Sequence, residues 1–347
     1  MPPQALQLIQ APIQGVRYRP ELVYKKADLH LHSHYSYDVL NLPDLSPRAL
    51  YEKAIRKGMG FFALTDHDTM KGILALEREL AAEYGTELPI PIIRGSEIKV
   101  KDRAVGHTIH VNVLGLDEAQ FLDLARRRKS LDAFLAYCVD HRLYHAYNHP
   151  FWFERGERPK LETVSSLIAR FPVIELNAGR IPQLNHRTAT LAAHYGKHLV
   201  ATSDSHTGQV AKAYAMAPGS TVEEFLGNLQ NGTSVAVPCN ATFADFMDEV
   251  KHVIDLVFAG QEAFRMKRTF LRTNPWARAV AAAALRSERV MKPGRLQRSL
   301  CRSLQVLAHG PAWAFIRQQE RMDLRLGDDT LGELSLGELS SSEALAH

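Results

Sequence analysis

The sequence predicts an α/β fold, a closed or nearly closed barrel of about seven strands, followed by a helical extension. Short apolar segments alternate with segments of helical periodicity between residues 27 and 240, as in repeated strand and helix units. Most of these apolar segments end in a polar cluster that contains His, Asp or Glu. Because α/β barrels build their active sites at the carboxyl ends of strands, both observations predict the same architecture.

The expected elements follow one another in a regular order. Ser46 and Pro47 supply the cap and first-turn proline of a helix that runs to Gly58. We expect further helices over residues 72–84 and 121–141, with a possible short strand over 21–24 before the barrel. The strands expected in the barrel are residues 28–32, 61–65, 90–94, 108–114, 143–147, 173–176 and 198–202.

The chain is predicted to have four parts: a lead-in over residues 1–26, the barrel over 27–240, a basic helical extension over 241–325 and a disordered tail over 326–347. Its 46% hydrophobic and 23% charged residues are ordinary for a globular protein. A net charge of +4 is too small to make the whole molecule a polyanion binder.

The lack of a recognisable targeting signal and the few, scattered cysteines favour a cytoplasmic protein. The three cysteines, Cys138, Cys239 and Cys301, are far apart and form no CxxC pair, so neither a disulfide framework nor a thiolate zinc site is indicated. The chain begins without a signal-like segment. It also has no apolar run of about 18–20 residues, so we expect no transmembrane segment.

The pair His30 and His32 is the first candidate metal site. Side chains on a strand alternate between faces, so both imidazoles point the same way and can reach one ion. The alternative from this pair alone is two histidines packed in the core, which would leave two polar rings on a face that normally holds Val, Ile or Leu.

Later strand ends add further candidate ligands. Nine nitrogen and oxygen donors exceed what one ion can bind, so we expect two or three divalent ions that share a bridging carboxylate, with Glu97 in that role. Glu97, Asp204 and His206 are also the candidates for a catalytic role. The nine predicted ligands are His30, His32, Asp38, His67, Glu97, His110, His149, Asp204 and His206.

Five ordered motifs in residues 27–240 resemble the polymerase and histidinol phosphatase (PHP) domain family. The motifs are Asp28-Leu29-His30-Leu31-His32-Ser33, Thr65-Asp66-His67-Asp68, Gly95-Ser96-Glu97-Ile98, Asn148-His149-Pro150 and Ser203-Asp204-Ser205-His206. The resemblance implies a distorted (β/α)7 barrel, a trinuclear centre of zinc, manganese or iron, and hydrolysis of phosphate esters. It also implies three sites: His30, His32, Glu97 and Asp204; Glu97, His110 and His149; and Asp38, His67 and His206.

The sequence departs from the family pattern in two places. The first motif usually carries Asp five residues after its second histidine, whereas here Tyr37 holds that place and Asp38 follows, as in a known variant. A further motif of the family, a histidine shortly before Leu-Gly, falls here on residues 106–115, which offer two histidines, His107 and His110. We prefer His110 because it lies inside the expected strand.

Clustered divalent ions lower the pKa of a water, supply hydroxide near neutral pH and offset phosphoryl charge, so no Ser or Cys nucleophile is needed. Arg180 is the best placed cation for the phosphate oxygens, and Lys212 and Arg94 are weaker candidates. For Arg180 the alternative is an ordinary surface arginine. His34 is a candidate substrate contact or general acid, against a solvated loop histidine.

The C-terminal extension is strongly basic. Residues 265–302 hold eleven Lys or Arg against one acid, Glu288. Such an excess suits an anionic partner, whether nucleic acid, a membrane surface or a protein. A solvated basic face packed beside the barrel is the simplest alternative.

The predicted activity is hydrolysis of small phosphomonoesters such as nucleotides or sugar phosphates, with short-oligonucleotide exonuclease activity as a close variant. Two alternatives remain at this point. A metal-dependent amidohydrolase also begins with His-x-His, but that family bridges its metals with a modified lysine. A catalytically silent PHP scaffold would act through its basic helical extension.

Overall fold

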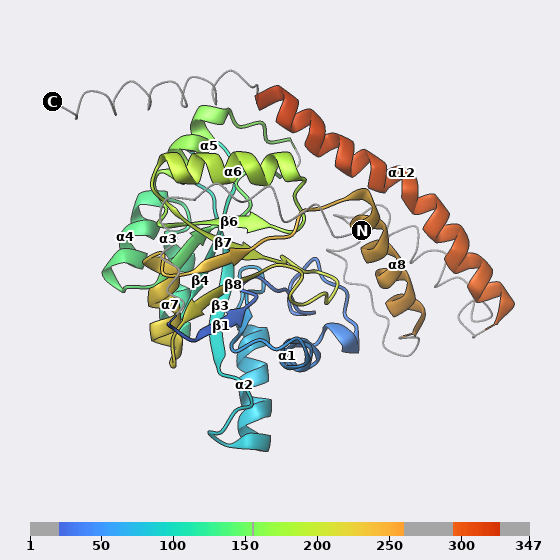
Figure 1. The fold of residues 1–347 in the computed structure, drawn as a ribbon, viewed down its shortest axis with the longest axis horizontal. Coiled ribbons are helices and arrows are strands. Elements are labelled where there is room, and N and C mark those ends of the chain that lie inside the picture. Colours follow the sequence, from blue (N-terminus) through green and yellow to red (C-terminus); the bar gives the residue numbers. More distant parts are fainter. Residues whose placement is uncertain (1–20, 155, 260–293, 327–347) are drawn as a thin grey trace.

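The computed structural model describes residues 21–154, 156–259 and 294–326, and it confirms the α/β fold with a C-terminal helix (Figure 1). Its centre is a curled six-stranded sheet in the order β2-β3-β4-β5-β6-β7. These strands are β2 Phe62–Leu64, β3 Ile92–Val100, β4 Ile109–Leu114, β5 Tyr144–Tyr147, β6 Val173–Asn177 and β7 His198–Thr202.

The sheet is mixed, which corrects the expectation of parallel strands throughout. Strand β4 runs antiparallel to both β3 and β5, while the other neighbouring pairs are parallel. Only residues 101–108 separate β3 from β4, too few for the crossover that a parallel pair needs. Strand β3 is also longer than predicted, so Glu97 lies within the strand and not just beyond its end.

The segment around His30 and His32 closes the barrel, although it is not the regular strand that the sequence predicts. Leu31 forms a parallel bridge with Ser205 beyond β7. On its other side, the Thr65 amide beyond β2 donates to the Leu31 carbonyl at 2.9 Å. The segment therefore occupies the gap between the two edge strands β2 and β7.

A second sheet, in the order β1-β8-β9, packs beside the first. Strand β1 Tyr24–Ala27 pairs antiparallel with β8 Tyr214–Pro218, which pairs with β9 Val235–Val237. The strand expected at residues 21–24 therefore begins and ends three residues later.

Helices cover the outside of the curled sheet (Figure 1). The expected helix over residues 121–141 is two helices, because Ser130 caps a new helix through its side chain, which accepts from the Ala133 amide. The helices are α1 Pro47–Arg56, α2 Lys71–Tyr84, α3 Glu118–Arg127, α4 Leu131–Asp140, α5 Leu161–Ile168, α6 Pro182–His194, α7 Val222–Gln230, α8 Phe243–Ala259 and α12 Arg295–Leu326; a short 3-10 helix spans Pro43–Leu45.

The inner face of the sheet changes from apolar to polar along the strands. Ile93, Leu114, Val173 and Val200 belong to a buried cluster that α7 covers with Phe225 and its neighbours. Because side chains alternate with period two, the same faces continue to Glu97 on β3, His110 on β4 and Glu175 on β6. The antiparallel course of β4 explains why its ligand candidate lies near the start of the strand.

Helices α8 and α12 lie against each other on one side of the barrel (Figure 1). Their contact includes Ile254 and Leu304, with Val250 and Leu300 packed around them. No helix among the described residues is long and apolar enough to cross a membrane. Three predictions lie wholly or mostly outside the described residues: most of the lead-in, most of the basic cluster of residues 265–302, and the tail after residue 326.

Candidate metal centre

Glu97 lies at the centre of the site and is completely buried. Its Oε2 atom lies 3.2 Å from His30 Nε2, 3.4 Å from His32 Nε2 and 2.8 Å from His67 Nδ1. Its Oε1 atom lies 2.9 Å from His110 Nδ1 and 3.1 Å from His149 Nε2. One carboxylate thus faces five imidazoles, and its two oxygens divide them into two groups.

Two other carboxylates complete the cluster. Asp204 Oδ1 lies 3.4 Å from His30 Nε2 and 3.3 Å from His32 Nε2. Asp38 Oδ2 lies 3.0 Å from His67 Nε2 and 3.3 Å from His206 Nε2. All nine predicted ligands therefore gather in one place.

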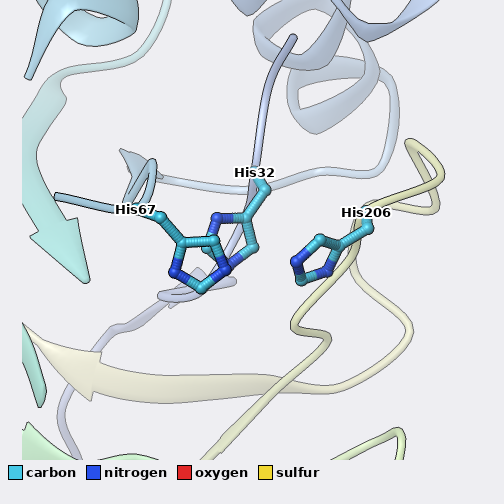
Figure 2. A group of neighbouring side chains, drawn as sticks. All are labelled: His32, His67 and His206. Atoms are coloured by element: carbon cyan, nitrogen blue, oxygen red, sulfur yellow. The ribbon is translucent and has the colours of Figure 1, made fainter. Parts of the chain in front are cut away.

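Figure 2 shows the rings of His32, His67 and His206 converging from three separate chain segments. The rings of His32 and His206 have centroids 4.2 Å apart, and those of His32 and His67 are 4.3 Å apart. One donor atom from each of the three residues lies within 4.8 Å of the others. The same spacing holds for three more triads, His30-His32-Asp204, His30-Glu97-His149 and His67-Glu97-His110.

Hydrogen bonds around the cluster orient its first two histidines. His30 Nδ1 donates to Glu175 Oε1 at 2.6 Å. His32 Nδ1 lies 3.0 Å from the Ser36 hydroxyl, which donates its own proton to Asp66 and therefore accepts from the ring. Metal ligation requires both rings to be neutral. Each Nε2 atom then carries a lone pair, and the two atoms lie 3.0 Å apart.

This donor set fits divalent cations. With both rings neutral, two nitrogen lone pairs and two carboxylate oxygens converge on one small volume, and a cation bound between them would relieve their repulsion. Several buried atoms of the cluster also have no hydrogen bond of acceptable geometry among the described residues. These atoms are Glu97 Oε2, His67 Nδ1, His110 Nε2 and Asp204 Oδ1.

The pKa shifts follow from the same crowding. Burial alone would lower the pKa of His30, but Asp204, Glu97 and Glu175 outweigh it and raise that pKa well above its usual range. Burial would raise the pKa of Glu97, yet the histidines around it hold that pKa well below its usual value. Burial lowers the pKa of His110 to about 4, so its ring is neutral near pH 7.

Two ligand positions have backbone angles that side chains rarely adopt. His149 has φ 29° and Asp204 has φ 49°. Buried carboxylates stabilise both turns: the His149 amide donates to Glu175 Oε2 at 2.7 Å, and Asp28 accepts from the Ser203 and Ala211 amides at 3.0 and 2.9 Å. Glu175 and Asp28 therefore hold the ligands in place from behind.

A family model described as PHP domain matches residues 28–231 of the chain. The chain belongs to the PHP domain family. This confirms the resemblance that the five motifs carry.

Individual relatives share shorter stretches with this PHP domain protein. It is 40% identical over 94 residues to the 5'-3' exoribonuclease of Haemophilus influenzae, covering 27% of this chain and 30% of the relative. It is 33% identical over 91 residues to phosphoribosyl 1,2-cyclic phosphate 1,2-diphosphodiesterase of Eggerthella lenta, covering 26% of this chain and 31% of the relative. The matches thus span about a third of each relative.

Among solved structures, the fold is similar to PsfC from Pseudomonas syringae, with a TM-score of 0.47 at 16% identity over 69% of this chain and 98% of that chain.

The three cations predicted to contact the substrate differ in their partners: Lys212 and Arg94 form ion pairs, whereas Arg180 Nε has no acceptor among the described residues. Arg180 is 8% exposed, and its Nε atom finds no acceptor among the described residues. Burial lowers its pKa, an effect that Asp204 and Glu175 oppose, which places its charge in the field of the site. Lys212 instead pairs with Glu249 of α8 at 2.9 Å, and Arg94 pairs with Glu77 at 2.7 Å.

Two further histidines were candidates, His34 as a substrate contact and His107 as an alternative metal ligand. His34 lies with its ring against Tyr35, with centroids 4.9 Å apart, and its amide donates to the Leu45 carbonyl. His107 is buried against Phe153, with ring centroids 5.6 Å apart. Of the two candidates His107 and His110, His110 is therefore the one beside Glu97.

Sequence reasoning missed the residues that support the PHP cluster. Glu175 accepts from His30, His149 and Asn177, and Asn148 Nδ2 donates to Glu97 Oε1 at 3.0 Å. Trp152 packs edge-on against His110, with ring centroids 4.8 Å apart. Asn148 directly follows β5 and Glu175 lies within β6, so their positions carried a signal, but nothing local identified their partners.

Proposed function

We propose that this PHP domain holds two or three divalent metal ions and hydrolyses phosphate esters. The observation that carries the proposal is the position of Glu97, whose two buried oxygens face five histidines at the polar end of the barrel interior. Imidazole and carboxylate donors together suit zinc, iron or manganese.

Three groups of residues would hold the ions. The first is His30, His32, Glu97 and Asp204; the second is Glu97, His110 and His149; the third is Asp38, His67 and His206. Ions bound there would supply an acidified water and offset the negative charge of the phosphoryl group. Glu97, as the shared carboxylate, would fix the spacing between the groups.

The remaining polar side chains would bind and orient the substrate. Arg180 presents a guanidinium whose Nε has no acceptor among the described residues, and a planar fork of N–H donors matches two phosphate oxygens. Burial of Arg180 removes competing water, which strengthens that contact. Arg180 is therefore the proposed phosphate ligand of the chain.

Small phosphomonoesters remain the first proposed substrates. Diesters are the second candidate, because the two named relatives are an exoribonuclease and a cyclic phosphodiesterase. The amidohydrolase alternative loses support because the central bridging position holds Glu97 and not a lysine.

The test compares three substrate classes with one metal-loaded preparation. We expect hydrolysis of p-nitrophenyl phosphate or bis-p-nitrophenyl phosphate, abolished by a chelator and restored by Mn²⁺ or Zn²⁺. The ratio of the two rates assigns the monoester or diester preference. Turnover of amides with none of either phosphate ester would overturn the proposal.

A further inference from the structure

We propose that the C-terminal helix α12 is a working part of the active site, because Gln319 holds the loop that carries Arg180 in its phosphate-binding position. The inference rests on the proposed function and adds a positioning residue to it. The sequence places Gln319 about 140 residues from Arg180, in a helix that would otherwise be a simple appendage.

The contacts of Gln319 enclose Arg180 on both sides. The Ile181 amide donates to Gln319 Oε1 at 3.1 Å, and Gln319 Nε2 donates to the Gly179 carbonyl at 3.2 Å. The Arg180 carbonyl itself accepts from the Ala241 amide at 2.8 Å. The backbone of this short loop, from Gly179 to Ile181, is thus fixed by groups far away in sequence.

The side chain of Arg180 also meets α12. Its guanidinium lies 6.0 Å from the centre of the Phe315 ring, at the outer range of a cation–π contact. Phe315 lies four residues before Gln319, so both face the loop from adjacent turns of the helix. One helix face therefore contacts the backbone and the charged group of the same residue.

Helix α12 packs against the barrel through buried side chains and an ion pair. Gln319 is only 2% exposed, and Ala308 and Ala312 on the same stripe are buried as well. One turn further on, Asp323 pairs with Arg187 of α6 at 2.9 Å, where the Arg187 side chain is 4% exposed. A buried amide that is satisfied on both sides specifies the register of the helix on the barrel.

Glutamine suits this position because its amide both donates and accepts, and the loop offers one carbonyl and one amide. Loss of both bonds would loosen the Gly179–Ile181 loop, which Ala241 and Asn177 would still hold through the Arg180 carbonyl and the Gly179 amide. The metal ligands lie on other segments, so their geometry would stay intact. The expected defect is therefore in substrate binding, with no loss of metal.

The test measures Gln319→Ala and Gln319→Met against Gln318→Ala, a matched control because Gln318 is the exposed neighbour on the same helix. Methionine keeps the length and packing of the side chain but makes neither hydrogen bond. For both Gln319 variants we expect KM for the phosphate ester, and Ki for inorganic phosphate, to rise about tenfold. We expect kcat within about twofold, unchanged metal content and a wild-type circular dichroism spectrum.

A double-mutant cycle with Arg180→Ala separates positioning from general destabilisation. If Gln319 acts through Arg180, then adding Gln319→Ala to Arg180→Ala leaves KM unchanged. Independent, multiplicative effects on KM would overturn the inference, as would wild-type KM and Ki in Gln319→Met.

The two proposals fail in different ways. Turnover by the wild-type protein with no defect in the Gln319 variants overturns this inference alone. A metal-loaded wild-type protein that neither hydrolyses phosphate esters nor binds inorganic phosphate overturns the proposed function and this inference together.

Discussion

Replacing Glu175 with Gln should weaken metal binding although Glu175 is not among the nine predicted ligands. The side chain is 1% exposed and accepts four hydrogen bonds. On Oε1 the donors are His30 Nδ1 at 2.6 Å and the Thr202 hydroxyl at 2.5 Å. On Oε2 they are the His149 amide at 2.7 Å and Asn177 Nδ2 at 3.1 Å.

In place of Oε2, the amide nitrogen of the introduced glutamine would meet two N–H donors, the His149 amide and Asn177 Nδ2. In place of Oε1 it would meet the His30 ring N–H, while the Thr202 hydroxyl can turn to accept. One or two hydrogen bonds to a charged acceptor are therefore lost. Each contributes about 1.5–3 kcal/mol, so the gross loss is roughly 1.5–6 kcal/mol before relaxation. The expected effect on metal affinity is smaller than this loss. Removing the hydrogen-bond partner of a ligating histidine typically weakens metal affinity by about 10–100-fold. Depending on the orientation, either His30 would lose the acceptor that fixes its tautomer or the His149 turn would lose the acceptor of its amide.

Titration of the metal-free protein with Zn²⁺ or Mn²⁺ measures this effect. Glu162→Gln is the matched control, because Glu162 is exposed in the first turn of α5. We expect the control to bind like the wild type and Glu175→Gln to bind about 10–100-fold more weakly. A folded Glu175→Gln protein with affinity within about threefold of wild type would refute the role assigned to Glu175.

Three further predictions test other parts of the account. Arg180→Ala should raise KM for the phosphate ester at unchanged metal content, and unchanged kinetics would show that another cation binds the phosphate. Burial lowers the pKa of His206, but Asp38 outweighs it and raises that pKa to about 9, so metal must displace a proton below that pH. Apparent affinity should therefore strengthen as pH rises toward 9, with proton release detectable by calorimetry in two buffers; pH-independent affinity would contradict this. Phe134→Ala should lower the free energy of unfolding by about 3–5 kcal/mol in denaturant titrations, because Phe134 is completely buried; a loss below about 1 kcal/mol would contradict the core assignment.

The sequence predicted most strands and helices, and the nine candidate ligands that it indicated lie together in the structure, because each lies in or beside a recognisable apolar segment. It did not predict the direction of β4, since period-two alternation is the same in either direction. That error matters for His110, which is near the start of its strand and still reaches Glu97.

The hydrogen-bond partners of residues far apart in the sequence were harder to predict than the positions of the candidate residues. The bond between His30 and Glu175 spans 145 residues, and that between Ile181 and Gln319 spans 138. No local pattern marks such a pair, because each residue alone is an ordinary polar side chain. The capping serine at Ser130 was a local signal, and it separates two helices that apolar periodicity alone had joined.

The most direct test of the account is the metal content of the protein measured together with its hydrolysis of phosphate esters, in the wild type and in Glu97→Gln. We expect two or three equivalents of divalent metal and chelator-sensitive hydrolysis in the wild type, with both strongly reduced in Glu97→Gln. Wild-type protein without bound metal after growth in metal-supplemented medium, or a Glu97→Gln protein that retains its metal and its activity, would contradict it.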